Sequence, residues 1–373
     1  MSPKERWRAT WRFEPLDRPW RFETLGFWKE TYREWADQGL PFWVRSDPAA
    51  YVYFNYDRWI PVVIGDHLQP GYWPRFRRKR VSSEGDHEIW QNECGGLEKV
   101  FAGDRSALPQ VIRPPVQTHQ DLERILPRLD PDAPGRLRPL RLDSFFDRAS
   151  IRAAQWLDYP LGMIFCGLFG ALRHLLGLER FMTATYDEPE LLHRIAEAWE
   201  RLVVGVGRRM AGYGATWAGF WEDMCYRNGM FISPRSYREL ILPYFKRAVA
   251  HLADCGIEFT WVDSDGDVTE LIPLVREAGI KGMMPFEVQA GMDVVEVREQ
   301  HPDFVIIGGL DKRLLADGRE AMEREIQEKA IPLLRSGGHI PGLDHAVPPN
   351  VTLEDFRWFL ERMRGEEIAA ACG

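Results

Sequence analysis

Residues 257–287 read IEFTWVDSDGDVTELIPLVREAGIKGMMPFE, and this stretch decides the fold class. Its first part, 257–263, is rich in β-branched and aromatic residues and predicts a buried strand. From Val268 to Ala278 the apolar residues have helical spacing, and Gly279 stands where a helix-ending glycine is expected. A second apolar run, 280–286, follows directly. Strand, helix and strand in this order are typical of a parallel sheet that is covered by helices.

The same alternation of strands and helices repeats outside this stretch. Further helices are predicted from Pro234 to Ala250, with Ser233 as N-cap, and from Arg319 to Arg335 ahead of Gly337. The eight candidate strands are 18–23, 59–65, 161–166, 215–221, 257–263, 280–286, 304–309 and 338–343. Eight strand–helix units plus one insertion predict a (β/α)8 barrel of the TIM type. A doubly wound sheet is the alternative, but no glycine-rich phosphate turn follows the first candidate strand.

One insertion after the second strand accounts for the remaining length. It is predicted at about 67–155 and includes a β-rich piece, HEIWQNECGGLEKVFAG, at 87–103. No repeat of fixed length occurs in the chain. We therefore predict a single barrel domain over residues 1–373, with the insertion as a lid.

The composition excludes several classes of function. The formal net charge is −8, and a net acidic chain argues against nucleic acid as the main partner because phosphate binding needs a positive field. Five scattered cysteines without a CxxC pair argue against a disulfide framework and favour a reducing compartment. Neither a secretory signal nor an apolar run suited to a membrane span is found, so a soluble, cytoplasmic protein is expected.

Acidic residues follow almost every predicted strand. In a barrel the active site lies at the carboxyl ends of the strands, so these side chains are expected to converge. Like charges persist together only with a cation, a shared proton or a basic partner such as Lys312. The alternative for each residue is a cap on the next helix. These acidic residues are Glu23, Asp66, Glu222, Asp223, Asp263, Asp265, Asp267, Glu287, Asp311 and Asp344.

The DSDGD run contains candidate metal ligands. Asp263 and Asp265 alternate with small residues and are expected to point the same way. With His345, which follows Asp344 at the last strand end, they could hold a divalent metal. An EF-hand is excluded, since glycine stands fourth in the run and Leu274 twelfth. A phosphatase loop of the DxDG type is disfavoured by its position after the fifth strand. HExxH, GxSxG and P-loop motifs are absent, so the classes that depend on them lack support.

Aromatic and basic residues give weaker indications. Trp28 and Trp221 are candidates for the wall of a pocket, and Trp221 is the stronger because it adjoins Glu222. Most tryptophans of the first 90 residues are expected to pack the N-terminal segment and the insertion onto the barrel. The basic run from Arg75 to Arg80 favours a solvated face over an anion site, although over a pocket it could hold substrate carboxylates.

Six segments share their order and spacing with a known protein family. They are KERWRATWRFEPLDRPWRFE (4–23), PLGMIFCGLFGALRHLLGLERFMTATYDEPELL (160–192), WEDMCYRNGMFISPRSYRELILPYFK (221–246), VDSDGDVTELIPLVREAGIKGMMPFEVQAGMDV (262–294), IIGGLDKRLLADG (306–318) and HIPGLDHAVPPNVTLEDF (339–356). By these segments the chain resembles the uroporphyrinogen decarboxylase superfamily over nearly its whole length. The resemblance implies a (β/α)8 barrel enzyme with its site at the carboxyl ends of the strands.

The resemblance favours one branch of this superfamily. True uroporphyrinogen decarboxylases carry an Arg-Gln-Ala-Gly-Arg-Tyr-like segment after the first strand, whose arginines hold substrate propionates; the stretch here, ETLGFWKETYREW (23–35), lacks it. The corrinoid-linked methyltransferases, including methylcobamide:coenzyme M types, have a zinc motif of His-x-Cys and a final Cys. Aligned by their flanks, these positions fall on Asp263, Asp265 and His345. The resemblance thus implies zinc or another divalent metal on oxygen and nitrogen ligands, acting as a Lewis acid.

We therefore predict a corrinoid-dependent methyltransferase that moves a methyl group between a small O-, N- or S-methyl donor and a corrinoid on a separate protein. The predicted roles are catalysis for Glu222, Asp223, Asp311, Lys312 and Asp344, substrate binding for Glu23, Trp28, Trp221, Asp267 and Glu287, and metal binding for Asp263, Asp265 and His345. The first alternative is a metal-independent decarboxylase or lyase for a carboxylated, tetrapyrrole-like substrate. The second is a non-catalytic binding barrel. A homodimer is expected.

Overall fold

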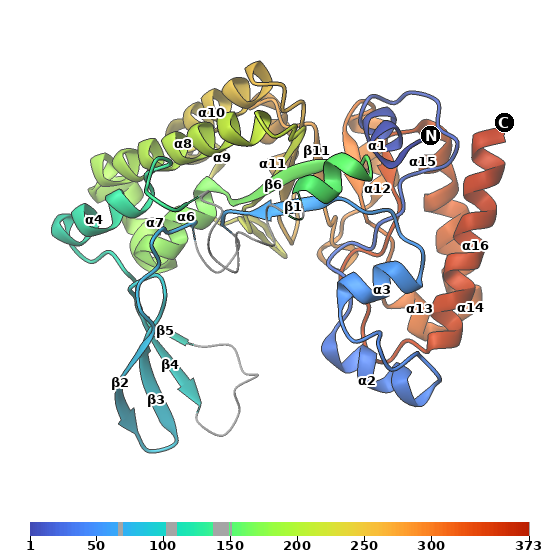
Figure 1. Ribbon diagram of the computed structural model, residues 1–373, viewed down its shortest axis with the longest axis horizontal. Coiled ribbons are helices and arrows are strands. Elements are labelled where there is room, and N and C mark those ends of the chain that lie inside the picture. The colour runs from blue at the N-terminus through green and yellow to red at the C-terminus, as the bar shows by residue number, and fades with distance from the viewer. Residues whose placement is uncertain (66–69, 102–109, 137–148, 150, 373) are drawn as a thin grey trace.

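Seven parallel strands form the main sheet of the computed structural model, which describes residues 1–65, 70–101, 110–136, 149 and 151–372 (Figure 1). Their order is β1-β6-β7-β10-β11-β12-β13. The strands are β1 (Ile60–Val63), β6 (Leu161–Cys166), β7 (Trp217–Trp221), β10 (Phe259–Asp263), β11 (Gly282–Met284), β12 (Val305–Ile307) and β13 (His339–Ile340). Each lies within a predicted strand, so the predicted α/β barrel class with a parallel sheet is confirmed.

Helices pack around this sheet (Figure 1). They are α1 (Pro3–Trp11), α2 (Lys29–Asp37), α3 (Asp47–Tyr53), α4 (His119–Ile125), α6 (Leu168–Leu176), α7 (Leu178–Asp187), α8 (Pro189–Ala211), α9 (Pro234–Leu240), α10 (Leu242–Asp254), α11 (Leu271–Glu277), α12 (Val294–Gln300), α13 (Leu314–Asp317), α14 (Arg319–Glu325), α15 (Ile331–Ser336) and α16 (Leu353–Cys372). Within the described residues, none of the helices has both the length and the apolar character that a membrane span requires.

Two predicted helices are divided in the structure. The helix predicted from Pro234 is α9 followed by α10, because Pro243 has no N–H to donate to the carbonyl of Glu239. The predicted cap is present, since Ser233 Oγ accepts the N–H of Ser236 at 3.0 Å. The helix predicted from Arg319 is α14 and α15, joined by one π-helical turn that precedes a proline in α15.

The predicted first strand, 18–23, is not a strand. The segment is extended and lies between the two edges of the sheet. Before β1, Asp57 N–H donates to the carbonyl of Arg21 at 3.0 Å, and the Asp57 carboxylate accepts Arg21 N–H at 2.9 Å. After β13, Glu23 Oε1 accepts Leu343 N–H at 3.0 Å. Side-chain carboxylates thus take backbone donors that a strand ladder would use, and seven strands rather than eight form the sheet.

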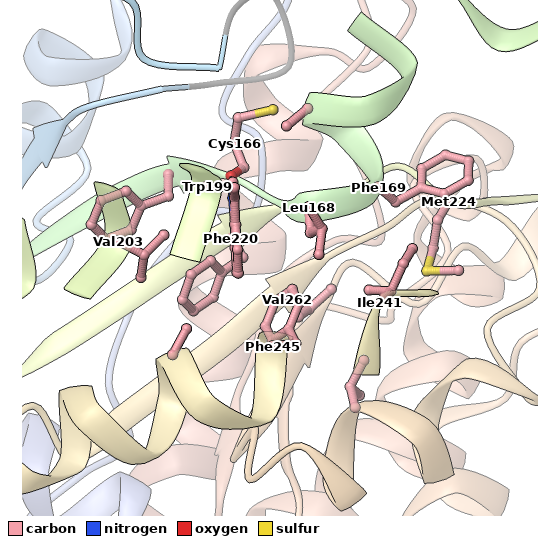
Figure 2. Packing of buried hydrophobic residues seen from close by; sticks show 14 of the residues in the cluster. Cys166, Leu168, Phe169, Trp199, Val203, Phe220, Met224, Ile241, Phe245 and Val262 are labelled. Atoms are coloured by element: carbon pink, nitrogen blue, oxygen red, sulfur yellow. The ribbon is translucent and has the colours of Figure 1, made fainter. Parts of the chain in front are cut away.

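Side chains along the strands alternate between the interior of the barrel and the helices outside. Trp217, Phe259 and Trp261 point inward and pack with the N-terminal tryptophans Trp7 and Trp11, which close the base of the barrel. The neighbouring positions point outward, and Figure 2 shows Phe220 and Val262 among the apolar side chains of α8 and α10. The base of the barrel is therefore an aromatic core, and only the opposite end of the strands is polar.

A four-stranded antiparallel sheet lies in the chain between β1 and β6 and extends away from the barrel (Figure 1). Its strands are β2 (Lys79–Glu84), β3 (His87–Gln91), β4 (Leu97–Phe101) and β5 (Gln110–Arg113). The described part of the predicted β-rich piece forms the hairpin of β3 and β4. The basic run at its start is paired with carboxylates, and each paired arginine is more than half exposed. The pairs are Arg75–Glu93, Arg78–Glu98 and Arg80–Glu88. The run is thus a solvated face.

Candidate active site

Charged residues from five strand ends meet at the mouth of the barrel. We call this set the mouth cluster; it consists of Asp223, Asp263, Asp265, Glu287, Lys312, Asp344 and His345. The charges of Asp223, Glu287, Lys312 and Asp344 all act on the Asp265 carboxyl group, so these side chains lie close together. Asp263 and Asp344 are buried, whereas the other members are partly exposed and can be reached from solvent.

Asp263 has the most unusual environment in the mouth cluster. It ends β10, and it points inward because Phe259 and Trp261 on the same strand do so. Its side chain is buried, and Oδ2 has no hydrogen-bond partner in the described part of the chain. Burial, and then the negative charges of Asp223 and Asp265, raise its pKa well above the ordinary value. Its carboxyl group therefore binds a proton more tightly than an ordinary aspartate does and is suited to donating one.

Asp265 follows two residues later and titrates near neutrality. Burial, and then the negative charges of Asp223 and Glu287, raise its pKa to about 6, while Lys312 opposes them. The loop that carries it is fixed by Gly266, whose φ of +85° favours glycine and whose N–H donates to Glu287 Oε2 at 3.1 Å. A carboxyl group with this pKa is suited to both giving and taking a proton.

Asp344 holds three loops of the mouth together. Oδ1 accepts the backbone N–H of Lys312 at 3.1 Å, and Oδ2 accepts that of Val288 at 3.0 Å. Lys312 Nζ also lies 3.5 Å from Oδ1. Burial raises the pKa of Asp344, although Lys312 and the two backbone donors work against it. Asp344 thus fixes the loops that carry Val288 and Lys312 relative to its own.

His345 is placed to donate rather than to ligate. Its Nδ1 accepts the N–H of Ala346 at 2.8 Å. Burial and the charge of Lys312 lower its pKa, so the ring is neutral and its single proton resides on Nε2. A metal bound at Nε2 would need the other tautomer. Among the described residues, no three His, Cys, Asp or Glu side chains are arranged to hold a metal ion. As arranged, Asp263, Asp265 and His345 therefore do not fit the predicted metal, and no step below depends on one.

Glu222, predicted to be catalytic, is held by backbone donors at the start of a helix. Its side chain is completely buried, and its carboxylate accepts the N–H groups of Leu168 and Gly170 at 3.1 Å each, at the start of α6. Burial raises its pKa to about 8 despite these donors. A Cβ atom at Gly167 would lie 2.3 Å from Glu222 Cδ, so the glycine makes room for the cap.

Three other predicted residues are engaged outside the mouth cluster. Glu23 is buried, with Oε2 accepting the Tyr56 hydroxyl at 2.9 Å, and burial raises its pKa to about 7. Burial alone would raise the pKa of Asp311, but hydrogen bonds from Arg313 lower it, and the two form an ion pair at 2.6 Å. Asp267 accepts the N–H of Thr269 in a local turn. Glu23 and Asp311 thus connect parts of the protein through a hydrogen bond and an ion pair, and Asp267 shapes the loop before α11.

The two tryptophans that were predicted to bind substrate differ in their position relative to the mouth cluster. Trp221 ends β7, is paired in register with Asp263, and is partly exposed, so it lies at the mouth as predicted. Trp28 is half exposed at the start of α2, and no described contact links it to the mouth cluster. Asp66 lies outside the described residues.

One charged residue beside the mouth cluster was not singled out by the sequence analysis. Arg173 of α6 donates to the Asp223 carbonyl at 3.0 Å, and its guanidinium lies 3.4 Å from the Asp223 carboxylate. In the sequence it stands within an otherwise apolar stretch. Arg173 lies in α6, the first helix after β6, and β6 ends at the mouth of the barrel. This position in the sequence could have indicated that Arg173 lies near the site.

A separate groove of about 630 Å³ lies on the outside of the barrel. It runs along α8 and is lined by residues such as Leu126, Arg201 and His251. None of the predicted site residues lines it, so its size does not make it the active site.

Comparisons with known proteins bear on the family and the fold of this chain. The family model described as Uroporphyrinogen decarboxylase (URO-D) matches residues 96–365. A protein named uroporphyrinogen decarboxylase from Syntrophotalea carbinolica is 26% identical over 265 residues, which are 67% of this chain and 71% of that protein. Another of that name, from Corynebacterium diphtheriae, is 28% identical over 185 residues, 46% of this chain and 49% of its own length.

A similar solved structure is that of a methyltransferase from Methanosarcina mazei. It superposes with a TM-score of 0.63 at 14% identity and covers 98% of this chain and 99% of its own. At this identity the likeness speaks for the fold alone. Because the family model matches well over half of the sequence, this chain belongs to the uroporphyrinogen decarboxylase family.

Proposed function

We propose that this protein transfers a methyl group from a small methylated donor, and that the mouth cluster supplies the proton taken up by the leaving atom. The observation that carries the proposal is Asp263, a buried carboxyl group with an unpartnered oxygen among other carboxylates. When the bond from the methyl carbon to oxygen, nitrogen or sulfur breaks, that atom keeps the electron pair. A proton delivered to it avoids an anionic leaving group. A corrinoid on a separate protein would accept the methyl group.

Each member of the mouth cluster has a part in this scheme. Protonated Asp263 donates to the leaving atom, and Asp265, with its pKa of about 6, returns a proton from solvent. The neutral ring of His345 offers its Nε2–H to orient the donor. Lys312 and Asp344 hold the loops in position. The acid thus performs the activation that the sequence assigned to a Lewis-acid metal.

The surplus of carboxyl groups supports methyl transfer over the removal of a carboxylate. Among the described residues, five carboxyl groups outnumber the cations that act on them, which are Lys312, Arg173 and Arg313, so a substrate rich in carboxylates would be repelled. The five are Asp223, Asp263, Asp265, Glu287 and Asp344. The stretch 23–35 also lacks the arginines that hold propionates in true uroporphyrinogen decarboxylases.

The proposal is tested by methyl transfer to free, chemically reduced cobalamin. Methyl ethers, thioethers and amines labelled with ¹³C are offered in turn, and the methyl resonance is followed by NMR. We expect at least one donor to react, and Asp263→Asn to lower the rate by a factor on the order of 10² to 10⁴. Asp303→Asn is the matched control, because Asp303 precedes β12 at the other end of the barrel and is exposed. An unchanged rate in Asp263→Asn would contradict the proposal.

Family membership favours decarboxylation as a second candidate. The same buried acid would then protonate a substrate carbon, and the neighbouring carboxylates would stabilise the cation formed before carbon dioxide is lost. Release of ¹⁴CO₂ from carboxyl-labelled uroporphyrinogen, without transfer from any methyl donor, would favour this candidate over the first.

A further inference from the structure

We infer that Asp223 is the charged partner of an acid pair with Asp263: a left-handed turn of the backbone and the Arg173 side chain hold its carboxylate beside Asp263, so that the proton destined for the leaving atom stays on Asp263 until it is used. The inference rests on the proposed function and adds a positioning residue to it. It depends on three features of the loop after β7, which are its backbone conformation, its contacts and its charge.

The backbone at Asp223 has a conformation that residues other than glycine rarely adopt. Its φ is +45°, in the left-handed region, which glycine alone enters without a steric cost. Aspartate tolerates this region better than most residues, and Asp158, which precedes β6 at the other end of the barrel, has a φ of +53°. The conformation of Asp223 is therefore possible for an aspartate, but it persists only where neighbouring contacts hold it.

Contacts on two sides hold Asp223 next to Asp263. Its N–H donates to the Asp263 carbonyl at 3.2 Å. From the other side, Arg173 Nη1 donates to the Asp223 carbonyl at 3.0 Å, and Nη2 donates to Oδ2 of its carboxylate at 3.4 Å. Arg173 thus contacts both the backbone and the side chain of Asp223, and a cation beside the carboxylate favours its negative charge.

The two carboxyl groups of the pair have different surroundings. Asp223 is partly exposed and has a cationic partner, whereas Asp263 is 1% exposed and its Oδ2 has no partner in the described part of the chain. Two neighbouring carboxyl groups avoid a double negative charge by retaining one proton, which resides on the group whose charge is less well solvated. Such a difference in surroundings makes one group the acid and the other its charged partner. Asp263 is therefore the acid of the pair.

The charge of Asp223 has a larger effect on Asp263 than any other described charge. Burial is the first cause that raises the pKa of Asp263, the charge of Asp223 is the second, and that of Asp265 is the third. On its other side, β11 places the uncharged Met284 in register with Asp263. Lys312 acts on Asp265. Removal of the Asp223 charge should therefore weaken the binding of the Asp263 proton more than removal of the Asp265 charge.

Infrared spectroscopy tests the inference without any substrate. The carbonyl band of protonated Asp263 is isolated by subtracting the spectrum of the same protein with Asp263→Asn, and it is followed as the pH rises. We expect the band to disappear at least one pH unit lower in Asp223→Asn than in the unmodified protein. Asparagine tolerates the left-handed backbone as aspartate does, so this variant removes the charge and keeps the conformation. Asp158→Asn is the matched control and should leave the band unchanged.

Two further measurements separate charge from structure. Arg173→Met leaves the Asp223 charge unopposed, so the band should persist to a higher pH than in the unmodified protein. In the methyl-transfer assay, Asp223→Asn should lower kcat about tenfold at pH 8 and recover most of it at pH 6, with KM nearly unchanged, because Asp263 is protonated again at the lower pH. Acid would not restore a structural defect. Thermal unfolding curves identify any variant that fails to fold.

Each outcome either supports or overturns the inference. An unshifted band in Asp223→Asn, an equal shift in Asp158→Asn, or a loss of kcat that pH 6 does not restore would overturn it. If Asp223→Asn fails to fold, a band that Arg173→Met leaves unshifted would overturn it as well. A shifted band in a protein that transfers no methyl group would support the acid pair and defeat the proposed function. Methyl transfer with an unshifted band would do the reverse.

Discussion

The ends of β7 and β10 lie side by side, and each carries a buried carboxyl group. The two groups differ in their hydrogen-bond partners. The backbone N–H of Glu222 donates to the Asp263 carbonyl at 2.9 Å, so the two residues are immediate neighbours. The Glu222 carboxylate is held by backbone donors of α6, whereas Asp263 Oδ2 has no partner in the described part of the chain. In the sequence both residues follow an aromatic strand and look alike.

The difference follows from the alternation of side chains along a strand. Trp221, not Glu222, is in register with Asp263 and shares its inward direction. Glu222 is one residue further along and therefore points outward, toward the first turn of α6. A shift of one residue thus separates a structural carboxylate from a candidate catalytic one. Position at a strand end does not by itself identify an active-site residue.

Removal of the helix cap should have the largest effect on stability. Glu222→Ala leaves backbone donors of α6 without a partner and creates a cavity at a completely buried position. We expect it to lower the free energy of unfolding by about 3 kcal/mol. Urea denaturation followed by circular dichroism measures the change. A loss below about 1 kcal/mol would mean that Glu222 is not a structural cap.

The stability of the protein should depend on pH in a way that reflects the raised pKa of Glu222. The pKa of Glu222 is raised from 4.5 to about 8 on folding, so the folded protein binds this proton more tightly than the unfolded chain. Its contribution is complete below pH 4.5 and is lost as the pH rises through about 8. Glu222 should therefore make the protein less stable as the pH rises between these values, by up to about 1.4 kcal/mol per pH unit. Denaturation at several pH values should show a shallower slope in Glu222→Gln; an identical slope would contradict this assignment.

Local sequence patterns predicted most of the fold but only part of the site. The parallel strands were recognised because each one is a short run of apolar and β-branched residues that ends at a polar residue or a glycine. Such a run indicates a buried strand without any knowledge of distant contacts. The segment 18–23 was wrongly predicted as a strand because side-chain carboxylates replace its ladder partners. The Asp57 carboxylate accepts the N–H of Arg21, and the Glu23 carboxylate accepts the N–H of Leu343, contacts between residues far apart in the sequence. The convergence of Asp263 and Asp265 was foreseen. The tautomer of His345 was not, because it depends on a backbone N–H that only the folded loop brings into place.

Asp263→Asn should have the opposite effect on stability from a change at Glu222. An amide keeps the shape of the side chain and removes the repulsion from Asp223 and Asp265. We expect the free energy of unfolding at pH 8 to stay the same or to rise by about 1 kcal/mol, even though the activity is lost. Thermal and urea unfolding at pH 8, run beside Asp303→Asn, measure this. A clear loss of stability would indicate that Asp263 has a structural role like that of Glu222.

Arg173 joins the two regions and should give the smallest effect. It pairs with Asp223 at 3.4 Å, both side chains are more than a quarter exposed (29% and 27%), and its charge also acts on Glu222. An ion pair with this exposure contributes at most about 1 kcal/mol, so Arg173→Met should barely change unfolding. The variant also removes a positive charge that lowers the pKa of Glu222, so the loss of stability with rising pH should continue to a slightly higher pH than in the unmodified protein. Urea denaturation at several pH values measures both effects. A loss well above about 1 kcal/mol would show that Arg173 contributes more than an exposed ion pair does.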